Sequence, residues 1–384
     1  MPLSNESLKI NRPMLKGFLS NHSSDDKVVS IIAEPETIYF ENARDSLNLN
    51  FDFVIKGLTE RELIIKFIKV AVYDENYNLI TFRHLNHNGV GTPSIHTLGK
   101  FEINGQETID VFNPFHNFSK EMKIDHLRYM FTFMDKETKE EFYYGNIQIK
   151  PIYFHQKVKL FLPLQGLLTI IDGHDFYSHH RRFGMTIVRN VTSGKFASNF
   201  SRFSVDFTLV GPDGNLQELK PDEFKNNYDF HFSDVKKFHT HGIDVIAPAD
   251  GEVVDVVSNL EDLYSIPFSM DKAIQENSIE DIAGNYLIIQ HNNQEFSHLF
   301  HLLKNSITVK VGQKVKQGEK MAKIGFSGAA TTYSHLHYQL MDNKNFLEDN
   351  PLPCKFSDVI IIQGSTERRY KEIILDTGDF VRAN

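Results

Sequence analysis

The pattern of hydrophobic and polar residues predicts a chain built mainly of β-strands. Between about 36 and 160, apolar residues recur at every second position, and residues two apart share one face of a strand. The alternation predicts one strand with a single apolar face, carried by Leu47, Leu49, Phe51, Phe53 and Ile55. Further strands are predicted at 125–134 and 142–150.

These features divide the chain into three parts. Residues 1–30 are polar and irregular and are expected to form a flexible arm. Several short strands with turns between them indicate an immunoglobulin-like β-sandwich at 31–155, to which we assign an accessory role. Residues 156–384 are expected to form a second strand-rich domain, with its core at 160–360. Two polar stretches break the strand rhythm of this domain and are interpreted as surface insertions, at about 211–237 and 258–283.

Two patterns in the second domain predict tight turns in a small antiparallel sheet. Residues 286–291 and 296–302 flank two asparagines, which is typical of a hairpin. Residues 309–318 alternate around Gly312 and Gly318, and glycine allows the chain to turn sharply at such corners.

Composition limits the classes of partner and compartment. The formal net charge of −9 argues against a nucleic-acid partner, which usually requires a basic surface. The single cysteine, Cys354, excludes an intramolecular disulfide. No run of about 18 apolar residues occurs, so no membrane span is expected. The first residues have no apolar signal core, so we expect a cytoplasmic protein, or a periplasmic or secreted one if an export signal was removed. The oligomeric state stays open.

Among the 18 histidines, the triplet His335-Leu336-His337 is the strongest candidate for chemistry. If this segment is a strand, both imidazoles lie on one face, roughly 7 Å apart by strand geometry. That arrangement suits one histidine bound to a metal and a second beside it. A chance H-x-H in a histidine-rich chain is the alternative when the triplet is taken alone.

A second candidate is His301, in the predicted hairpin strand. His298 lies three residues earlier and is expected on the opposite face. Only one of the two can then join a common site, and His301 is expected to share its face with Ser297 and Leu299.

The segment from Gly284 to Asp342 resembles the catalytic core of the lysostaphin-type (LytM-type) zinc metallopeptidases. The hairpin histidine is followed by a V-x-x-G-x-x-V-x-x-G corner at 309–318, a G-x-S-G loop at 325–328 and the final H-L-H strand. The resemblance extends over about 160–360, to a branch of the family with long insertions and an N-terminal β domain. It implies an antiparallel β-sheet peptidase domain.

The resemblance also implies one Zn²⁺ per chain, held by a histidine, an aspartate and the second histidine of H-x-H. His337 is then a metal ligand, and His335 and His301 are the catalytic, non-ligand histidines. The family's H-x-G-x-D motif resembles the segment of His241 and Asp244, but Thr240 occupies the position of the motif's histidine.

An earlier pair matches the branch with long insertions better. In that branch, an H-R-R segment lies upstream of the strand that carries the ligand aspartate. Residues 180–182 of this chain resemble the segment, and residues 201–207 resemble the strand. We therefore assign the remaining two metal ligands to His180 and Asp206. His179 is the substitute for His180 as a metal ligand. The pair His241 and Asp244 is the runner-up for the two ligand positions.

The function implied is hydrolysis of peptide bonds by a zinc-activated water, with the peptide part of peptidoglycan or another peptide as substrate. The alternative is a catalytically inactive protein of the same fold that binds, activates or recruits a cell-wall hydrolase. Complete ligands favour the enzyme. A biotinyl- or lipoyl-carrier domain would share the glycine corners of 309–318, but no second half of that motif is present.

Overall fold

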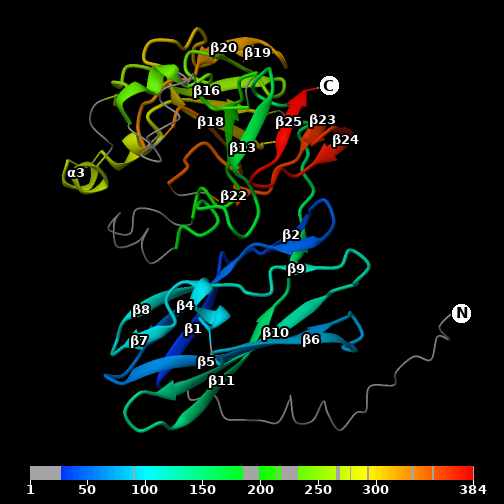
Figure 1. Ribbon diagram of the computed structural model, residues 1–384, viewed down its shortest axis with the longest axis vertical. Helices are drawn as coiled ribbons and strands as arrows, with labels where there is room; N and C mark the ends of the chain where they lie inside the picture. The colour runs from blue at the N-terminus through cyan, green and yellow to red at the C-terminus, as the bar shows by residue number, and fades with distance from the viewer. Residues whose placement is uncertain are drawn as a thin grey trace, which may run out of the picture. The chain divides into compact units, whose positions relative to one another are not determined.

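The computed structural model describes residues 27–89, 91–184, 199–212, 214–217, 232–264, 269–276, 278–291, 294–329, 333–347 and 350–383 (Figure 1). Most of the predicted arm at 1–30 lies outside these residues. The chain folds into two compact units. The first contains residues up to Ile32, Ile55–Ile109 and Ile124–Ile149, and the second contains the remainder, including Ala33–Val54 and Asp110–Lys123. The domain bounds at 155 and 156 stay a prediction.

The N-terminal part of the chain consists of β-strands, as predicted. Its largest sheet has the order β11-β10-β5-β6, and β7 pairs with β5. The strands predicted at 125–134 and 142–150 are β10 and β11, which pair antiparallel. The elements are β1 (Val29–Glu34), β2 (Tyr39–Asn42), β3 (Leu47–Leu49), β4 (Asp52–Gly57), β5 (Glu62–Tyr73), β6 (Leu79–Asn86), η1 (Ser94–Leu98), β7 (Glu102–Asn104), β8 (Thr108–Phe112), β9 (Asn117–Phe118), β10 (His126–Asp135), β11 (Glu141–Ile149) and β12 (Ile152–Tyr153).

The single strand predicted from 47 to 55 is in fact two strands, β3 and β4. The chain leaves regular structure at Asn50 and Phe51, and the two strands belong to different sheets. The polar positions of the alternation are not on a solvated face either, because Asn50 and Asp52 are both buried. Buried polar groups require partners, and those of Asp52 lie in the second unit, described below.

The second unit is built on one antiparallel sheet with the order β19-β16-β17-β18-β21-β14-β13-β25-β23-β24, and β22 pairs with β21. The predicted hairpin at 286–302 is the pair β17 and β18. The elements are β13 (Leu168–Asp172), β14 (Val205–Leu209), η3 (Phe232–Lys237), β15 (Asp244–Ile246), β16 (Gly251–Val257), α3 (Met270–Gln275), η4 (Ile279–Ala283), β17 (Asn285–Gln290), β18 (Phe296–Leu302), β19 (Lys314–Val315), β20 (Lys320–Lys323), β21 (Leu336–Met341), β22 (Pro351–Leu352), β23 (Phe356–Gln363), β24 (Thr366–Ile373) and β25 (Phe380–Ala383).

The two faces of this sheet have different surroundings. On β21, Leu336, Tyr338 and Leu340 point into the main hydrophobic core of the unit. The alternate residues of a strand point to the other face, and there a smaller apolar cluster contains Phe300, Phe346 and Met341. The polar residues of the site lie on this second face.

Because the described residues of both units form mainly strands, the predicted β-dominated fold is confirmed.

The two stretches predicted as insertions contain short helical elements among their described residues. Residues 218–231 lie outside the described part of the chain, and 232–237 form η3. The stretch 258–283 contains α3 and η4, but it ends at Ala283, which is 1% exposed and packs in the smaller apolar cluster. Both insertions, with their approximate bounds, stay a prediction. Among the described residues, no helix is long and apolar enough to cross a membrane.

Candidate functional site

A row of residues directly opposite one another on adjacent strands forms the floor of the site. Asp172 of β13 pairs with Asp206 of β14, which pairs with His337 of β21, which in turn pairs with Phe300 of β18. Residues paired in this way share one face of the sheet, with Cβ atoms about 5 Å apart. The strand register therefore gathers two carboxylates, one imidazole and one phenyl ring.

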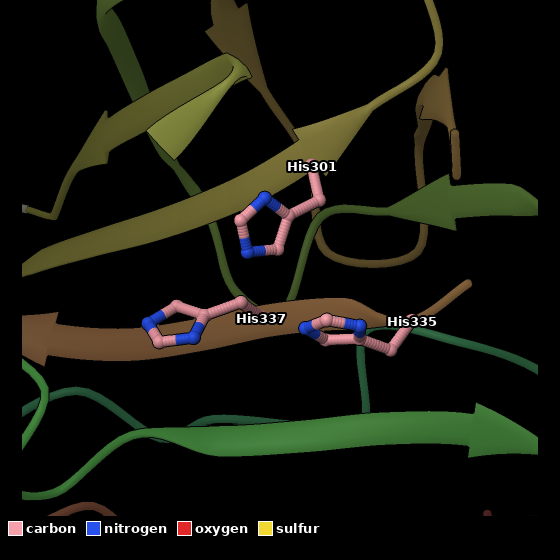
Figure 2. A group of neighbouring side chains, drawn as sticks. All are labelled: His301, His335 and His337. Carbon is pink, nitrogen blue, oxygen red and sulfur yellow. The ribbon is translucent and has the colours of Figure 1, made fainter. Parts of the chain in front are cut away.

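The H-x-H triplet presents both imidazoles to this face, as its spacing predicts. His335 immediately precedes β21, and His337 lies within it (Figure 2). The Oδ2 atom of Asp206 is 3.4 Å from His335 Nε2, and its Oδ1 atom is 3.2 Å from His337 Nδ1. Both histidines are 5% exposed, so these polar groups interact where water does little to screen them.

His301 joins the triplet, but not by the geometry expected of a regular strand. Its φ angle of 62° breaks the alternation at the end of β18, so it faces the same side as Phe300. Its ring centroid lies 4.9 Å from that of His335 and 5.8 Å from that of His337. The expectation that His301 shares its face with Ser297 and Leu299 is therefore wrong, because Leu299 packs in the main core. His298 faces the site side, opposite Gln339, and binds the Asn343 carbonyl.

His180 reaches the site from an irregular segment between β13 and β14. Its Nε2 atom is 3.5 Å from Asp206 Oδ2, and its ring meets that of His337 edge to face at 4.7 Å. The amide of Asn199 donates a hydrogen bond to the His180 carbonyl at 2.9 Å. His180, Asp206 and His337 each offer one ligand atom within 4.8 Å of those of the other two.

A buried ion cluster anchors the segment that carries His180. Arg181 donates to Asp52 Oδ1 at 2.6 Å and to the Phe51 carbonyl at 2.8 Å. Arg202, near the start of β14, donates to Asp52 Oδ2 at 2.8 Å. All three charged side chains are at most 2% exposed. Asp52 therefore links the segments on both sides of the site to β4, and no local sequence pattern indicates this partner.

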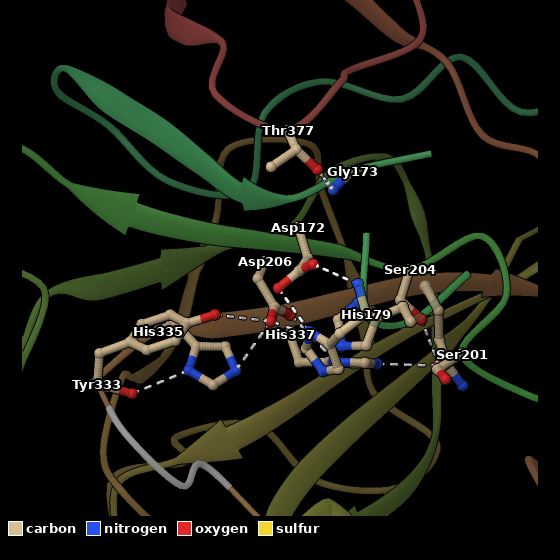
Figure 3. A network of polar contacts seen from close by, with 12 residues as sticks. Asp172, Gly173, His179, Ser201, Ser204, Asp206, Tyr333, His335, His337 and Thr377 are labelled. Carbon is tan, nitrogen blue, oxygen red and sulfur yellow. Dashed lines mark hydrogen bonds and ion pairs between the residues drawn. The ribbon is translucent and has the colours of Figure 1, made fainter. Parts of the chain in front are cut away.

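His179 lies beside His180 but has a different environment. Its side chain is 65% exposed, and its Nδ1 atom is 2.6 Å from Asp172 Oδ2 (Figure 3). The hydrogen bond to the Asp172 carboxylate raises the pKa of His179. His179 therefore faces Asp172 rather than Asp206, so the geometry favours His180 as the ligand and not its neighbour.

Tyr333 is a site residue that the sequence patterns do not reveal. Its hydroxyl donates to Asp206 Oδ2 at 3.1 Å, and its carbonyl accepts a hydrogen bond from His335 Nδ1 at 2.9 Å. The side chain of Tyr333 thus contacts the Asp206 carboxylate, and the backbone carbonyl of Tyr333 orients His335. The only sequence signal was its position two residues before the triplet.

The runner-up pair lies away from this cluster. Asp244 is bound to Lys320 and Lys323 at 2.6 and 2.8 Å, and these lysines lower its pKa to about 2. His241 Nε2 lies 3.0 Å from the hydroxyl of Tyr264. Neither belongs to a group of described residues that could hold a metal ion.

The protonation states of the cluster follow from burial and from Asp206. Burial lowers the pKa of His180, His301 and His335 below the usual value, which favours neutral imidazoles. Burial alone would raise the pKa of Asp206, but the charge of the neighbouring imidazoles when they are protonated, that of His180 first, lowers it well below its usual range. Neutral imidazoles around an ionised carboxylate are the protonation states that metal binding requires.

The hydrogen bonds also select the tautomers. The Nδ1 atoms of His301 and His335 lie 2.9 Å from the carbonyls of Ser327 and Tyr333, which can only accept, so both Nδ1 atoms carry the proton. Their Nε2 atoms are left free to accept a proton. Gln339 Oε1 lies 3.1 Å from His337 Nε2 and so leaves Nδ1, the atom nearest Asp206, available as a ligand.

The donor set fits a divalent cation. Asp206 Oδ1 is buried and accepts no hydrogen bond, and the buried Nδ1 atom of His180 has no partner either. An unpaired buried carboxylate oxygen is costly, and a cation bound between Asp206, His180 and His337 would offset that cost. Two imidazoles and one carboxylate are ligands that zinc accepts.

A cavity of about 400 Å³ opens beside these groups. That volume lies within the usual range for ligand sites. One side is polar and the other apolar, and the lining residues are Asp172, His179, His180, Phe183, Phe200, Ser201, Asp206, Ile282, Ala283, Phe300, His301, Ala329, Tyr333, His335 and His337.

Comparison with protein families matches residues 234–348 to "Peptidase family M23". The chain contains an M23 peptidase domain. His301, His335 and His337 fall within the matched segment of this domain, whereas His180 and Asp206 precede it.

Several curated proteins are similar to this chain over short stretches. Peptidoglycan DD-endopeptidase ShyA of Vibrio cholerae is 46% identical over 59 residues, which cover 15% of this chain and 13% of the relative. ShyC of the same organism is 34% identical over 100 residues, covering 26% and 22%. An uncharacterized metalloprotease of Haemophilus influenzae is 33% identical over 130 residues, covering 34% and 22%. The chain thus spans less than a quarter of the length of these relatives.

Among solved structures, the catalytic domain of lysostaphin from Staphylococcus simulans is 20% identical, with a TM-score of 0.21 and coverage of 30% of this chain and 76% of that one. The structure titled "A Novel M23 Metalloprotease Pseudoalterin from Deep-sea" is 10% identical, with a TM-score of 0.27 and coverage of 57% and 100%.

Proposed function

We propose that this chain is a zinc-dependent peptidase that hydrolyses peptide bonds of peptidoglycan. The observation that carries the proposal is the buried carboxylate of Asp206, faced by His180 and His337 with ligand atoms within 4.8 Å of one another. Three protein ligands of these types leave a fourth position open, as in catalytic zinc sites. The alternative of an inactive regulator is not favoured, because a candidate is present among the described residues for each of the three ligands.

In this proposal, His180, Asp206 and His337 hold the metal. A zinc ion bound there would supply Lewis-acid chemistry and would lower the pKa of a water molecule towards about 7. His301 and His335 would orient an attacking water and accept its proton at Nε2, since the Nδ1 atom of each is committed to a carbonyl. Tyr333 keeps the Asp206 carboxylate in place.

Peptidoglycan is proposed as the substrate from the relatives. Three similar proteins of Vibrio cholerae are named peptidoglycan DD-endopeptidases. The cleft beside the histidines is open to solvent and large enough for part of a peptide. Both observations support a peptide substrate bound across the second face of the sheet.

Metal analysis of the purified protein tests the ligand assignment. We expect about one zinc per chain, as in single-metal catalytic sites. The Asp206→Ala variant should lose the metal, because the only carboxylate among the three ligands is removed. The matched control is Asp244→Ala, which removes a carboxylate from the same unit and should keep the zinc. Zinc retained by Asp206→Ala and lost by Asp244→Ala would overturn the assignment.

Digestion of purified peptidoglycan tests the activity. The zinc-loaded protein should release new amino groups, whereas His301→Ala should bind zinc normally and release none. If the zinc-loaded wild-type protein opens no peptide bond in peptidoglycan, the proposed substrate is wrong. Activity in His301→Ala equal to that of the wild type would remove this histidine from the mechanism.

A further inference from the structure

A second row of polar side chains lies beside the row that contains the proposed metal ligands Asp206 and His337. It consists of Ser204, just before β14, Gln339 of β21 and His298 of β18, and all three are fully buried. Ser204 donates a hydrogen bond to Gln339 Oε1 at 3.0 Å, and His298 lies directly opposite Gln339 on the neighbouring strand. Residues two apart on a strand share a face, so Gln339 faces the same side as His337.

The tautomer of His298 is fixed by a backbone carbonyl. Burial lowers the pKa of His298 to about 3, so the ring is neutral and only one of its nitrogens carries a proton. The Asn343 carbonyl oxygen lies 3.0 Å from His298 Nε2 and can only accept a hydrogen bond. The proton is therefore on Nε2, and Nδ1 can only accept. This Nδ1 atom is buried and has no partner among the described residues.

The side-chain amide of Gln339 has the complementary group unpaired. Its Oε1 atom lies 3.1 Å from His337 Nε2, whereas its own Nε2 atom is buried and lacks a partner within the described part of the chain. Directly opposite residues have Cβ atoms about 5 Å apart, so the unpaired donor of Gln339 and the unpaired acceptor of His298 lie on facing side chains. A buried polar group without a partner is costly. Each of these two groups can satisfy the other, directly or through one bridging water molecule.

We propose that His298 is a positioning residue that fixes the tautomer of His337 through the side-chain amide of Gln339. Because His298 Nδ1 only accepts, the NH2 group of Gln339 turns towards it, and Oε1 turns towards His337. Oε1 then holds the proton of His337 on Nε2 and leaves Nδ1 bare beside Asp206. The inference rests on the proposed metal site, because the bare Nδ1 atom is the one assigned to the metal.

The opposite orientation of the Gln339 amide would block that site. The NH2 group would then donate to His337 Nε2, and the imidazole proton would move to Nδ1. This atom lies 3.2 Å from Asp206 Oδ1, so the two proposed ligand atoms would bind each other. A metal ion would have to displace the proton before it could bind, and its affinity would fall.

Nitrogen-15 NMR of the metal-free protein with labelled histidines tests the tautomer without any metal. At a pH above the usual histidine pKa, we expect the wild type to carry the His337 proton on Nε2. His298→Phe keeps an aromatic ring but removes the acceptor, so the His337 proton should then be distributed between Nε2 and Nδ1. The signals of His337 are assigned by their loss in His337→Gln.

Zinc affinity, measured by competition with a chelator, tests the consequence. His298→Phe should lower the affinity about 10-fold or more, as loss of a partner of a ligand histidine typically does. Gln339→Glu is the matched background, because a carboxylate has no NH2 group and accepts from His337 in either orientation. In that background, His298→Phe should change the affinity by less than about 3-fold, since the coupling is absent. The control His291→Phe replaces another buried histidine of the unit, 2% exposed, and should leave zinc affinity unchanged.

The outcomes separate this inference from the proposed function. A metal-free wild type with the His337 proton on Nδ1 overturns the inference. An equal loss of zinc affinity from His298→Phe in both backgrounds also overturns it, because such a loss comes from the fold and not from the amide. If the wild type binds no zinc, the proposed function fails, whereas the tautomers of the wild type and of His298→Phe still decide the inference. His298→Leu replaces the phenylalanine variant if circular dichroism shows that the latter does not fold.

Discussion

Replacing Asp52 by asparagine removes one negative charge and almost no volume from the centre of the buried Arg–Asp–Arg cluster. Arg181 and Arg202 donate to its two carboxylate oxygens at 2.6 and 2.8 Å, and all three side chains are at most 2% exposed. The substitution leaves two buried guanidinium groups without their common counter-charge. Breaking a buried ion pair from one side costs about 3–5 kcal/mol, so we expect the free energy of unfolding of the second unit to fall by this amount.

The assay is urea denaturation followed by far-ultraviolet circular dichroism, because the chain contains no tryptophan. A matched control is Asp358→Asn. Asp358 also lies between two cations, Lys159 and Arg369, each at 3.3 Å, but its side chain is 33% exposed. Solvent-exposed ion pairs contribute about 0–1 kcal/mol. The two substitutions are chemically identical, so the difference between them measures the effect of burial.

A loss of less than about 1 kcal/mol in Asp52→Asn, or a loss equal to that in Asp358→Asn, would refute the argument from buried charge. Zinc affinity gives a second readout, since Arg181 is covalently next to His180. If Asp52→Asn destabilises the protein but binds zinc as tightly as the wild type, Asp52 holds the fold and does not position the metal ligand.

Two further predictions concern residues near the site. Tyr333→Phe removes the hydrogen bond to Asp206, and loss of such a partner should lower zinc affinity or peptide hydrolysis about 10- to 100-fold; unchanged metal binding and hydrolysis would exclude a positioning role. His174 lies between Glu41 and the Cys354 sulfur, at 3.0 and 3.5 Å. Burial acts to lower its pKa, but Cys354 and Glu41 outweigh burial and raise that pKa to about 10. Because the folded pKa is above the unfolded value of 6.5, the stabilisation is complete below pH about 6.5 and is lost as the pH rises through about 10, by at most ~1.4 kcal/mol per pH unit. Denaturation from pH 7 to 10 should show this loss in the wild type and not in His174→Gln, and parallel curves would contradict it.

Local patterns were sufficient for the parts of the site that lie on regular strands. The period of two placed His335 and His337 on one face, and the residues around β14 matched the motif that contains Asp206. The common face of His335 and His337 is confirmed, because a strand and its neighbours impose the side of each residue, and the role of Asp206 as a metal ligand stays a prediction.

Other features depended on contacts that no local pattern contains. His301 faces the site because of one left-handed backbone angle, and alternation assigned it to the wrong side. Asp52 occupied a polar position in an alternating stretch, yet its partners lie 129 and 150 residues further along the chain. The sequence patterns did not predict Tyr333 as a site residue, because the motif at this point of the chain consists of the histidine triplet alone.

The separation of the site along the chain restricts how this protein can be divided. A fragment cut at the bounds of the matched family segment, 234–348, would carry His301 and both histidines of the H-x-H triplet. It would leave behind His180, the Asp206 carboxylate and the Asp52 anchor. A fragment with those bounds would therefore keep the segment that matches the family but lack two of the three residues proposed as metal ligands, so a fragment prepared for metal binding should begin before β4.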